Sequence, residues 1–256
     1  DLDNDRDLDL IIINSTAPHE VYVNDRLWRY RPADGFDEFV NSSVAAAVAG
    51  DIDADGHVEL VTLSDDLELK VWSGPEIWQG QSMSKPLEDF EGEAHQGRDP
   101  QQSRAQIALL DVTGTGRLSL LRSQWDGVIV SSLDLATSTA THQGRLRSEG
   151  LRCWAPVLLE PSRGSSVVSL VANRDDQRDS LEFIEHGPGE GRYPFVTVSF
   201  TGKHDEGQSM RSNASGIGTR FAARSGTQWT LGRVLRDDSG PGQSLQPQAI
   251  GLGKKP

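Results

Sequence analysis

The sequence is poor in cysteine, in long apolar runs and in positive charge. Its 256 residues include one cysteine, Cys153, which excludes an internal disulfide framework and a cysteine-rich zinc site. Every apolar run is shorter than the roughly 18 residues that suggest a transmembrane helix, so membrane insertion is not expected. The 25 Lys and Arg residues face 38 Asp and Glu residues. The resulting net charge of −13 argues against a protein that chiefly binds nucleic acid or anionic lipid.

The usual signatures of catalysis are also missing from the sequence. It contains neither a G-x-S-x-G nucleophile motif nor a Walker A loop, and Gly216-Ile217-Gly218 lacks the third glycine of a dinucleotide loop. The six histidines show no HxH or HxxxH spacing. Cys153, beside Trp154, is interpreted as a small apolar residue of a strand. The sequence therefore favours a non-enzymatic protein.

An acidic loop followed by an apolar strand recurs along the chain. The copies begin at Asp1, Asp51 and Asp111, and a fainter copy covers 160–164. After each loop, a strand with period-two alternation leads through a turn into a second strand, as in 58–63 followed by 67–72. Repeats of this kind, about 50–60 residues apart, predict an all-β fold in which about four blades of a β-propeller are visible.

The second acidic loop is the most complete candidate metal site. Carboxylates at positions 1, 3, 5 and 9 converge on one point, and the glycine at position 6 allows the turn that brings the position-7 carbonyl into the set. Calcium accepts six to eight oxygen ligands with tolerant geometry, so Ca²⁺ is the predicted ion. The predicted ligands are the side chains of Asp51, Asp53, Asp55 and Glu59 and the carbonyl of His57. An EF-hand is rejected because Thr62 stands where that motif requires a bidentate acid.

The other copies differ in the carboxylates that they retain. The first loop offers five candidate ligands but carries Arg6 at the glycine position: Asp1, Asp3, Asp5, Asp7 and Asp9. The third has Thr113, Thr115 and Ser119 in place of acids, and the fourth has lost still more of the pattern. We therefore expect calcium at the second loop, a weaker site at the first, and none at the third or fourth.

The charge changes sign near residue 190. Residues 192–256 hold nine Lys and Arg residues against four Asp and Glu residues, whereas the rest of the chain is acidic. The segment Gly187-Pro188-Gly189-Glu190-Gly191 has the composition of a linker or a tight loop. This predicts two domains, 1–190 and 191–256.

The repeat D-x-D-x-D-G-x-x-D/E-L followed by an apolar strand resembles the FG-GAP (VCBS-type) repeat. This resemblance implies calcium-binding β-propeller blades, of which a whole propeller has about seven, so residues 1–190 are expected to be the C-terminal part of a propeller. Four visible repeats are also compatible with an isolated four-blade arrangement, which is the less favoured interpretation.

The C-terminal region carries a second resemblance. Asn213–Phe221, Arg233-Val234, Ser239–Ser244 and Gly251-Leu252-Gly253 are similar, in this order, to elements of the ASPIC/UnbV domain. The match at Gly240–Ser244 is loose, with Gln243-Ser244 reversed, and Tyr193–Phe200 fits that domain's opening strand. The two domains occur together in acidic secreted proteins such as the cartilage acidic protein family, so the resemblance implies a small C-terminal β domain and a secreted, periplasmic or cell-surface location.

These observations predict a non-enzymatic calcium-binding module that recognises an extracellular protein or a glycan. Two alternatives remain open at this point: a secreted carbohydrate-active enzyme of the polysaccharide lyase type built on a propeller, and a structural repeat of a surface assembly. Turnover of an acidic polysaccharide would indicate the first alternative, and self-assembly into filaments or sheets would indicate the second.

The sequence also predicts one irregular segment and the placement of five tryptophans. Residues 75–106 are expected to be irregular, with a short helix near 86–93. Trp72, Trp125 and Trp154 lie in apolar strand patterns and are assigned to the core. Trp28 and Trp78 lie in polar segments, where we favour core packing over an exposed role in stacking on sugars or anchoring a partner.

Overall fold

The structure is a mostly β arrangement of several antiparallel sheets, as expected from the period-two repeats. It is a computed structural model and describes residues 2–3, 5, 7–25, 29–74, 78–84, 105–124, 127–148, 150–175, 178–186, 192–202, 216–240 and 247–254. Within these ranges, no helix combines the length and the apolar character needed to cross a membrane.

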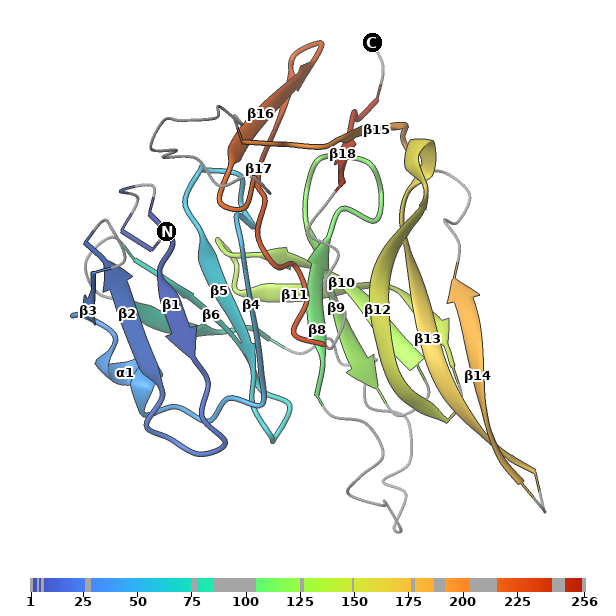
Figure 1. Ribbon diagram of the computed structural model, residues 1–256, viewed down its shortest axis with the longest axis horizontal. Helices are drawn as coiled ribbons and strands as arrows, with labels where there is room; N and C mark the ends of the chain where they lie inside the picture. The colour runs from blue at the N-terminus through green and yellow to red at the C-terminus, as the bar shows by residue number, and fades with distance from the viewer. Residues whose placement is uncertain are drawn as a thin grey trace, which may run out of the picture.

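The first four sheets follow one another along the chain, and every strand pairs with its sequence neighbour (Figure 1). The first sheet consists of β1 (Leu10–Ile12), β2 (Glu20–Asn24) and β3 (Tyr30–Pro32), followed by helix α1 (Asp37–Val40). The second consists of β4 (Ala46–Gly50), β5 (Glu59–Leu63), β6 (Leu69–Ser73) and β7 (Gln79–Ser82). The third consists of β8 (Ile107–Leu110), β9 (Ser119–Gln124), β10 (Gly127–Asp134) and β11 (Thr139–Arg147). The fourth consists of β12 (Leu151–Glu160), the 3₁₀ turn η2 (Pro161–Arg163), β13 (Gly164–Asp175) and β14 (Arg178–His186).

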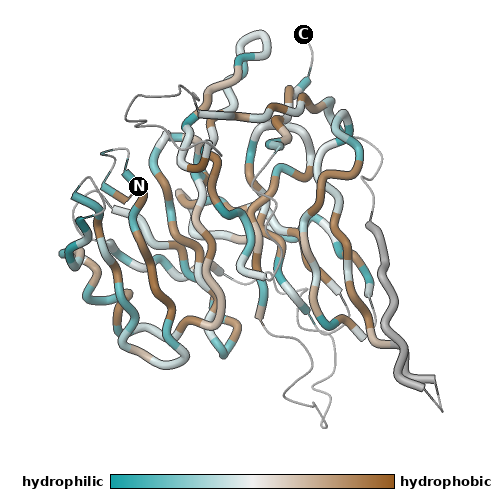
Figure 2. Tube along the Cα trace, in the orientation of Figure 1, coloured by the Kyte–Doolittle hydropathy of each residue, from teal (hydrophilic) through white to brown (hydrophobic). Residues whose placement is uncertain are grey.

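Three apolar cores lie between successive sheets. The alternation along each strand explains them, because neighbouring residues point to opposite faces. On β9, Leu120 packs into the core shared with the second sheet, while Leu121 packs into the core shared with the fourth. On β5, Leu60 faces the core shared with the first sheet and Val61 faces the third sheet. The middle sheets are therefore apolar on both faces, and Figure 2 shows hydrophobic residues concentrated along the strands.

Two tryptophans anchor the outer cores, as predicted. Trp72 is completely buried, packs edge-on against Phe39 and donates its indole N–H to the Thr62 hydroxyl at 2.8 Å. Trp154 is 1% exposed and donates to the Ser123 hydroxyl at 2.9 Å. Each buried indole therefore has a partner for its one polar group, which removes the cost of desolvating it.

Trp78 also belongs to the core, which agrees with the interpretation favoured from sequence. It is 4% exposed, and its ring stacks on Phe36 with a centroid separation of 4.9 Å. The predictions for Trp28, Trp125, the helix near 86–93 and the linker at 187–191 fall outside the described residues.

The expectation of an irregular segment at 75–106 was wrong at one place. Residues Gln79–Ser82 form β7, the outer strand of the second sheet. This strand has a polar composition and no hydrophobic alternation, so it gave no strand signal. Gly80 pairs with Trp72 and lies against its ring, where a Cβ atom would be 2.7 Å from the indole. The absence of a side chain at this position therefore allows the pairing.

The C-terminal region forms two further two-stranded sheets. Strand β15 (Phe195–Val198) pairs with β18 (Gln248–Gly251), and β16 (Arg220–Ser225) forms a hairpin with β17 (Gln228–Arg233). Both sheets lie at the end of the molecule where the acidic loops are found (Figure 1). The expected opening strand of this region, 193–200, is thus present as β15.

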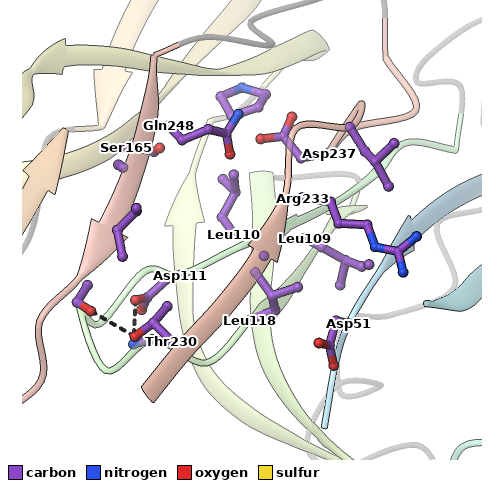
Figure 3. Close-up of a pocket in the computed structure, with 18 of the residues that line it drawn as sticks. Asp51, Leu109, Leu110, Asp111, Leu118, Ser165, Thr230, Arg233, Asp237 and Gln248 are labelled. Atoms are coloured by element: carbon purple, nitrogen blue, oxygen red, sulfur yellow. Dashed lines mark hydrogen bonds between the residues drawn. The ribbon is translucent and has the colours of Figure 1, made fainter. Parts of the chain in front are cut away.

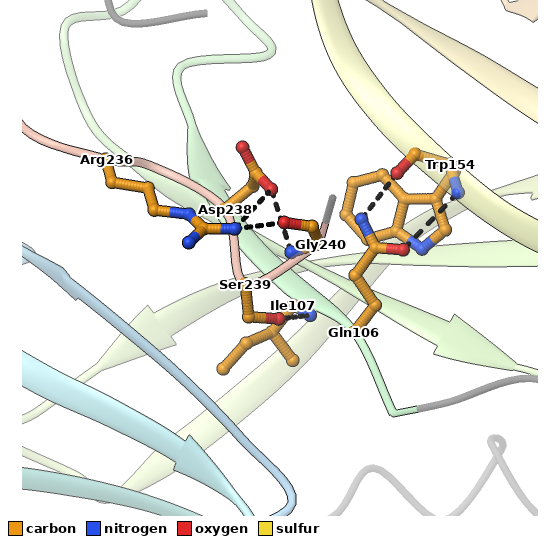
Figure 4. A network of polar contacts seen from close by, with 7 residues as sticks. All are labelled: Gln106, Ile107, Trp154, Arg236, Asp238, Ser239 and Gly240. Atoms are coloured by element: carbon orange, nitrogen blue, oxygen red, sulfur yellow. Dashed lines mark hydrogen bonds and ion pairs between the residues drawn. The ribbon is translucent and has the colours of Figure 1, made fainter. Parts of the chain in front are cut away.

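The chain after the hairpin covers the free edge of β8. The backbone N–H of Leu109 donates to the carbonyl of Asp237, and that of Ser239 donates to the carbonyl of Ile107, both at 2.8 Å. The hydroxyl of Ser239 accepts from the Ile107 N–H at 2.9 Å (Figure 4). Gln106, just before β8, hydrogen-bonds to the backbone of Trp154 in the fourth sheet. An otherwise unpaired sheet edge is therefore capped by residues about 130 positions later in the sequence.

Candidate metal centre

The second acidic loop joins β4 to β5 and is held at both ends by the second sheet. Gly50, the last residue of β4, pairs with Glu59, the first residue of β5. Asp51 directly follows the one strand and Glu59 begins the other, so the sheet itself brings loop positions 1 and 9 together. The paired strands thus fix the base of the loop, and the intervening residues need only turn back.

Three carboxylates of this loop form a cluster. One oxygen from each of Asp51, Asp53 and Glu59 lies within 4.8 Å of the others. Glu59 is 3% exposed, Asp51 is partly buried and Asp53 is exposed. The cluster could hold a metal ion, with Glu59 at its buried end and Asp53 facing solvent.

The backbone of the loop is arranged by hydrogen bonds to its own acids. Gly56 adopts φ +94° and Ala54 adopts φ +65°, so the chain turns through the left-handed region twice. The Gly56 N–H donates to Asp51 Oδ2 at 3.0 Å, and the Ile52 N–H donates to Glu59 Oε2 at 2.8 Å. These bonds fix the orientation of the two carboxylates at the base of the loop.

The electrostatics of the cluster are unfavourable for the metal-free, ionised state. Burial raises the pKa of Glu59 to about 7, and the negative charges of Asp53, Asp51 and Asp55 add to the effect. Burial likewise raises the pKa of Asp51, again with help from the neighbouring Asp55 and Asp53. A cation at this position would remove both the repulsion and part of the desolvation cost.

The donor set fits a hard divalent cation. All three side chains offer carboxylate oxygens, which Ca²⁺ and Mg²⁺ prefer, and the loop offers no sulfur or imidazole to the cluster. Asp51 Oδ1 is buried and has no hydrogen-bond partner, whereas Oδ2 of the same group is occupied by Gly56. The lone pairs of Oδ1 are therefore available to a ligand that the loop itself does not supply.

One predicted ligand of this loop, Asp55, is not among the three clustered carboxylates. The side chain of Asp55 accepts the backbone N–H of His57 at 2.7 Å and does not belong to the group within 4.8 Å. His57 is exposed and was predicted to contribute only its carbonyl. The observed role of Asp55 is to shape the turn that carries His57.

The first loop repeats the backbone pattern of the second loop. The Asp5 N–H donates to Asp3 and the Asp7 N–H donates to Asp5, as their counterparts do in the second loop. Asp9 accepts from the backbone N–H groups of Leu2 and Asn24. Among the described residues no three carboxylates of this loop come as close as those of the second, and Asp1 lies outside the described ranges.

The third loop has the same turn but a different chemistry. Its single carboxylate, Asp111, accepts four backbone N–H groups, at distances between 2.6 and 3.2 Å: those of Thr113, Gly114, Thr115 and Gly116. The hydroxyls of Thr113 and Thr115 hydrogen-bond to each other at 2.8 Å. Ser119, at the position of Glu59, is 4% exposed and donates to Gln143. The loop is closed by internal hydrogen bonds without a cluster of charges.

The fourth repeat forms a short turn. Residues Pro161–Arg163 make a single 3₁₀ turn between β12 and β13, and Arg163 lies 3.3 Å from the carboxylate of Glu160. The ring of Phe195 on β15 lies against Gly164. This region therefore packs against the C-terminal strands, as the third loop does.

A cleft of about 120 Å³ lies between the second and third acidic loops, β12 and the C-terminal strands (Figure 3). Its walls are mainly apolar and include Leu109, Leu118 and Ile250. Arg233 enters from β17, and its guanidinium donates to the Gly56 carbonyl at 3.4 Å. Burial lowers the pKa of Arg233 to about 10, with a further contribution from Arg220.

Arg233 and Asp237 were not among the site residues predicted from sequence. Burial raises the pKa of Asp237 to about 7, and the neighbouring Asp238 adds to the effect. Arg233 touches a loop 177 residues earlier in the chain, so no local pattern could have placed it there. The only sequence signal was the basic character of the C-terminal region, which faces acidic loops.

Comparison with known proteins adds no family assignment to this geometry. No family model matches the chain. No curated protein shows significant similarity to it.

Proposed function

We propose that this chain is a calcium-stabilised segment of a β-propeller with an ASPIC/UnbV-like C-terminal domain, acting outside the cytoplasm as a non-enzymatic binding module. The observation that carries the proposal is the Asp51, Asp53 and Glu59 cluster, in which three carboxylates converge and Asp51 Oδ1 is buried without a partner. Ca²⁺ suits this oxygen donor set, and millimolar extracellular calcium would fill even a weak site.

The arrangement of the sheets supports the propeller part of this proposal. Four sheets, each a run of sequence-adjacent antiparallel strands, share apolar cores with their neighbours, as propeller blades do. The acidic loops of the second and third sheets both connect the first strand to the second. Calcium would act by neutralising the second loop and holding β4 and β5 in register at its base.

The proposed role of the module is recognition of an extracellular protein or glycan. The described cysteine, Cys153, is half-buried on β12. His19 is buried, where its ring contacts Asn14 and the carbonyl of Ser42. Both residues have structural surroundings, which supports binding over catalysis.

Calcium titration by calorimetry tests the proposal, together with thermal melting in calcium and in chelator. We expect binding at the second loop and a rise in melting temperature with calcium. Asp53→Ala should remove that site, because Asp53 supplies one of three clustered carboxylates, whereas Thr113→Ala in the third loop should leave the stoichiometry unchanged. Unchanged stoichiometry in Asp53→Ala would refute the site.

A further inference from the structure

The β16–β17 hairpin has two chemically different faces. Its register pairs Arg220 with Arg233, Ala222 with Leu231, and Arg224 with Trp229, so these six side chains share one face. Arg220, Ala222, Arg224 and Trp229 are exposed. The hairpin projects from the same end of the molecule as β15 and β18 (Figure 1). We call these four exposed residues the outer face.

The opposite face of the hairpin is packed against the protein. The Thr230 hydroxyl donates to the Gly251 carbonyl at 3.1 Å, and Gln228 donates to the Thr115 carbonyl of the third loop. Phe221 stacks on Phe200 at a centroid separation of 5.2 Å. The hairpin is thus held by its inner face and, at its base, by Arg233, while the four residues of the outer face are exposed to solvent.

Trp229 and Arg224 form an ordered pair at the tip of the outer face. The guanidinium of Arg224 lies 5.6 Å from the centroid of the indole, and its Nε donates to the Gly226 carbonyl at 2.9 Å. Trp229 nevertheless remains 56% exposed, the largest exposure among the described large hydrophobic residues that reach the surface. An aromatic surface and a charged fork are therefore preorganised side by side.

The charge of the hairpin opposes that of the whole chain. Residues 220–233 contain three arginines and no acidic residue, within a protein of net charge −13. Such a local concentration of guanidinium groups favours a ligand that carries carboxylates, which arginine binds through two parallel hydrogen bonds.

We propose that the outer face binds an acidic oligosaccharide composed of uronic acid units. The exposed part of the indole would pack against the apolar C–H face of one pyranose ring. Arg224 would bind the carboxylate of that sugar, and Arg220, four residues back along β16, would bind a carboxylate further along the oligosaccharide. This proposal deepens the recognition role proposed above, but it does not rest on the calcium site.

Other ligands match this face less well. Single-stranded nucleic acid is held by a series of stacking aromatics and by many phosphate contacts, whereas the outer face offers one indole. Its dense phosphate charge would also meet the acidic remainder of the surface. A neutral glycan would offer no carboxylate to the arginines. A short uronate oligomer needs only the area around Trp229, Arg224 and Arg220.

The test is calorimetric or fluorescence titration of the full chain with a galacturonic acid tetrasaccharide. The comparison ligands are the carboxyl-reduced neutral tetrasaccharide and a single-stranded oligonucleotide. Trp229→Ala and Arg224→Gln should each weaken binding by about tenfold or more, since each removes an anchor or a charge-assisted pair. Arg224→Lys keeps the charge but loses the planar fork and should also weaken it. Arg147→Gln, an exposed arginine on β11, is the matched control and should change affinity less than about twofold.

Three results would overturn the proposal. These are no uronate binding by the wild-type chain, equal affinity of Trp229→Ala and wild type, and equal or tighter binding of the neutral sugar or the oligonucleotide. Thermal melting confirms that each variant is folded, which is expected because the substituted side chains are exposed. Calcium titration of the same samples separates this proposal from the previous one. Intact calcium binding without uronate binding refutes only the hairpin proposal, and uronate binding without calcium binding refutes only the metal site.

Discussion

The second and third loops share a backbone turn but differ in the groups that surround their first aspartate. Both begin with aspartate directly after a strand, and both place glycine with positive φ at the sixth position, Gly56 and Gly116. In the second loop Asp51 stands among other acids and keeps a buried oxygen without a partner. In the third, Asp111 is surrounded by four N–H donors. The second loop could complete this arrangement with a cation from solution, whereas the third completes it with donors from the chain itself.

The surroundings of the two loops differ accordingly. A Cβ atom at Gly56 would meet nothing within 4 Å, whereas one at Gly116 would lie 2.2 Å from the Thr230 hydroxyl. A Cβ atom at Gly114 would lie 2.5 Å from the Tyr193 carbonyl, so the third loop cannot carry alanine there as the second does at Ala54. The third loop is therefore packed closely against the C-terminal strands, whereas the second loop has open space at its glycine.

The largest expected effect comes from changing the ninth residue of each loop, which is Ser119 in the third loop and Glu59 in the second. Ser119→Glu would bury a carboxylate in a loop that provides no cation, and should lower the free energy of unfolding by about 3 kcal/mol or more. Ser119→Gln, of similar size without the charge, is the matched control. In the second loop Glu59→Gln should remove calcium binding without destabilising the chelated protein. Urea unfolding measures all three, and a Ser119→Glu variant as stable as Ser119→Gln would contradict this explanation.

The two equivalent glycine positions, Gly56 and Gly116, should respond unequally to alanine. Gly116→Ala combines a strained φ with a collision against Thr230 and should cost about 2–4 kcal/mol. Gly56→Ala meets open space and should cost only about 1 kcal/mol for its positive φ. Unfolding in chelator measures both without interference from metal, and equal losses would show that the third loop is not tightly docked.

The stability of the metal-free protein should fall as the pH rises from about 5 to about 8. Glu59 and Asp237 both have folded-state pKa values of about 7, above the ordinary carboxyl values. Between the unfolded-state pKa and the folded-state pKa of each group, the folded protein holds a proton that the unfolded chain has released. The folded state is therefore favoured at the acid end of this range, and the advantage is lost as the pH rises through about 7. A change of about 1–3 kcal/mol is expected from each of the two groups.

Substitutions and added calcium separate the contribution of Glu59 to this pH dependence from that of Asp237. Glu59→Gln and Asp237→Asn should each flatten part of the profile of the unfolding free energy. Saturating calcium should remove the Glu59 part alone, because the metal holds that carboxylate ionised. A profile that calcium leaves unaltered would argue against Glu59 as a ligand.

The smallest expected effect concerns the contact between the C-terminal region and the second loop. Arg233 lies beside Asp51, and its positive charge opposes the arrival of a cation. Arg233→Gln should therefore tighten calcium binding by about threefold, or roughly 0.5–1 kcal/mol. Arg224→Gln, on the same hairpin but at its tip, should leave calcium affinity unchanged. Weaker calcium binding in Arg233→Gln would mean that the guanidinium supports the loop through the Gly56 carbonyl instead.

Sequence reasoning succeeded where the information is local. The strands at 58–63 and 67–72 were expected from alternation and appear as β5 and β6, and the loop between β4 and β5 holds three of the predicted ligands together. The first strands of the two middle sheets were not identified. In β4 and β8, alanine and leucine runs bury both faces, so the alternation that marks a half-exposed strand is missing.

The features of the site that the sequence did not reveal have a different cause. Nothing in residues 51–59 indicates that the Asp55 carboxylate accepts the His57 N–H outside the three-carboxylate cluster, because that position depends on one backbone hydrogen bond. The docking of Thr230, Gln228 and Arg233 on the loops joins residues more than 110 positions apart. Such contacts are products of the tertiary fold and have no short-range signature.

The pairing of Asp237 and Ser239 with β8 has a consequence for biosynthesis. A ribosome completes the strands of the third sheet well before it reaches the residues that cap β8, so the nascent sheet keeps one bare edge while some 90 further residues are added. During that interval the unpaired N–H and C=O groups can recruit a strand from another copy. Chains that are interrupted before residue 237 are therefore expected to aggregate, because the edge of β8 is covered by residues that emerge about 130 positions later.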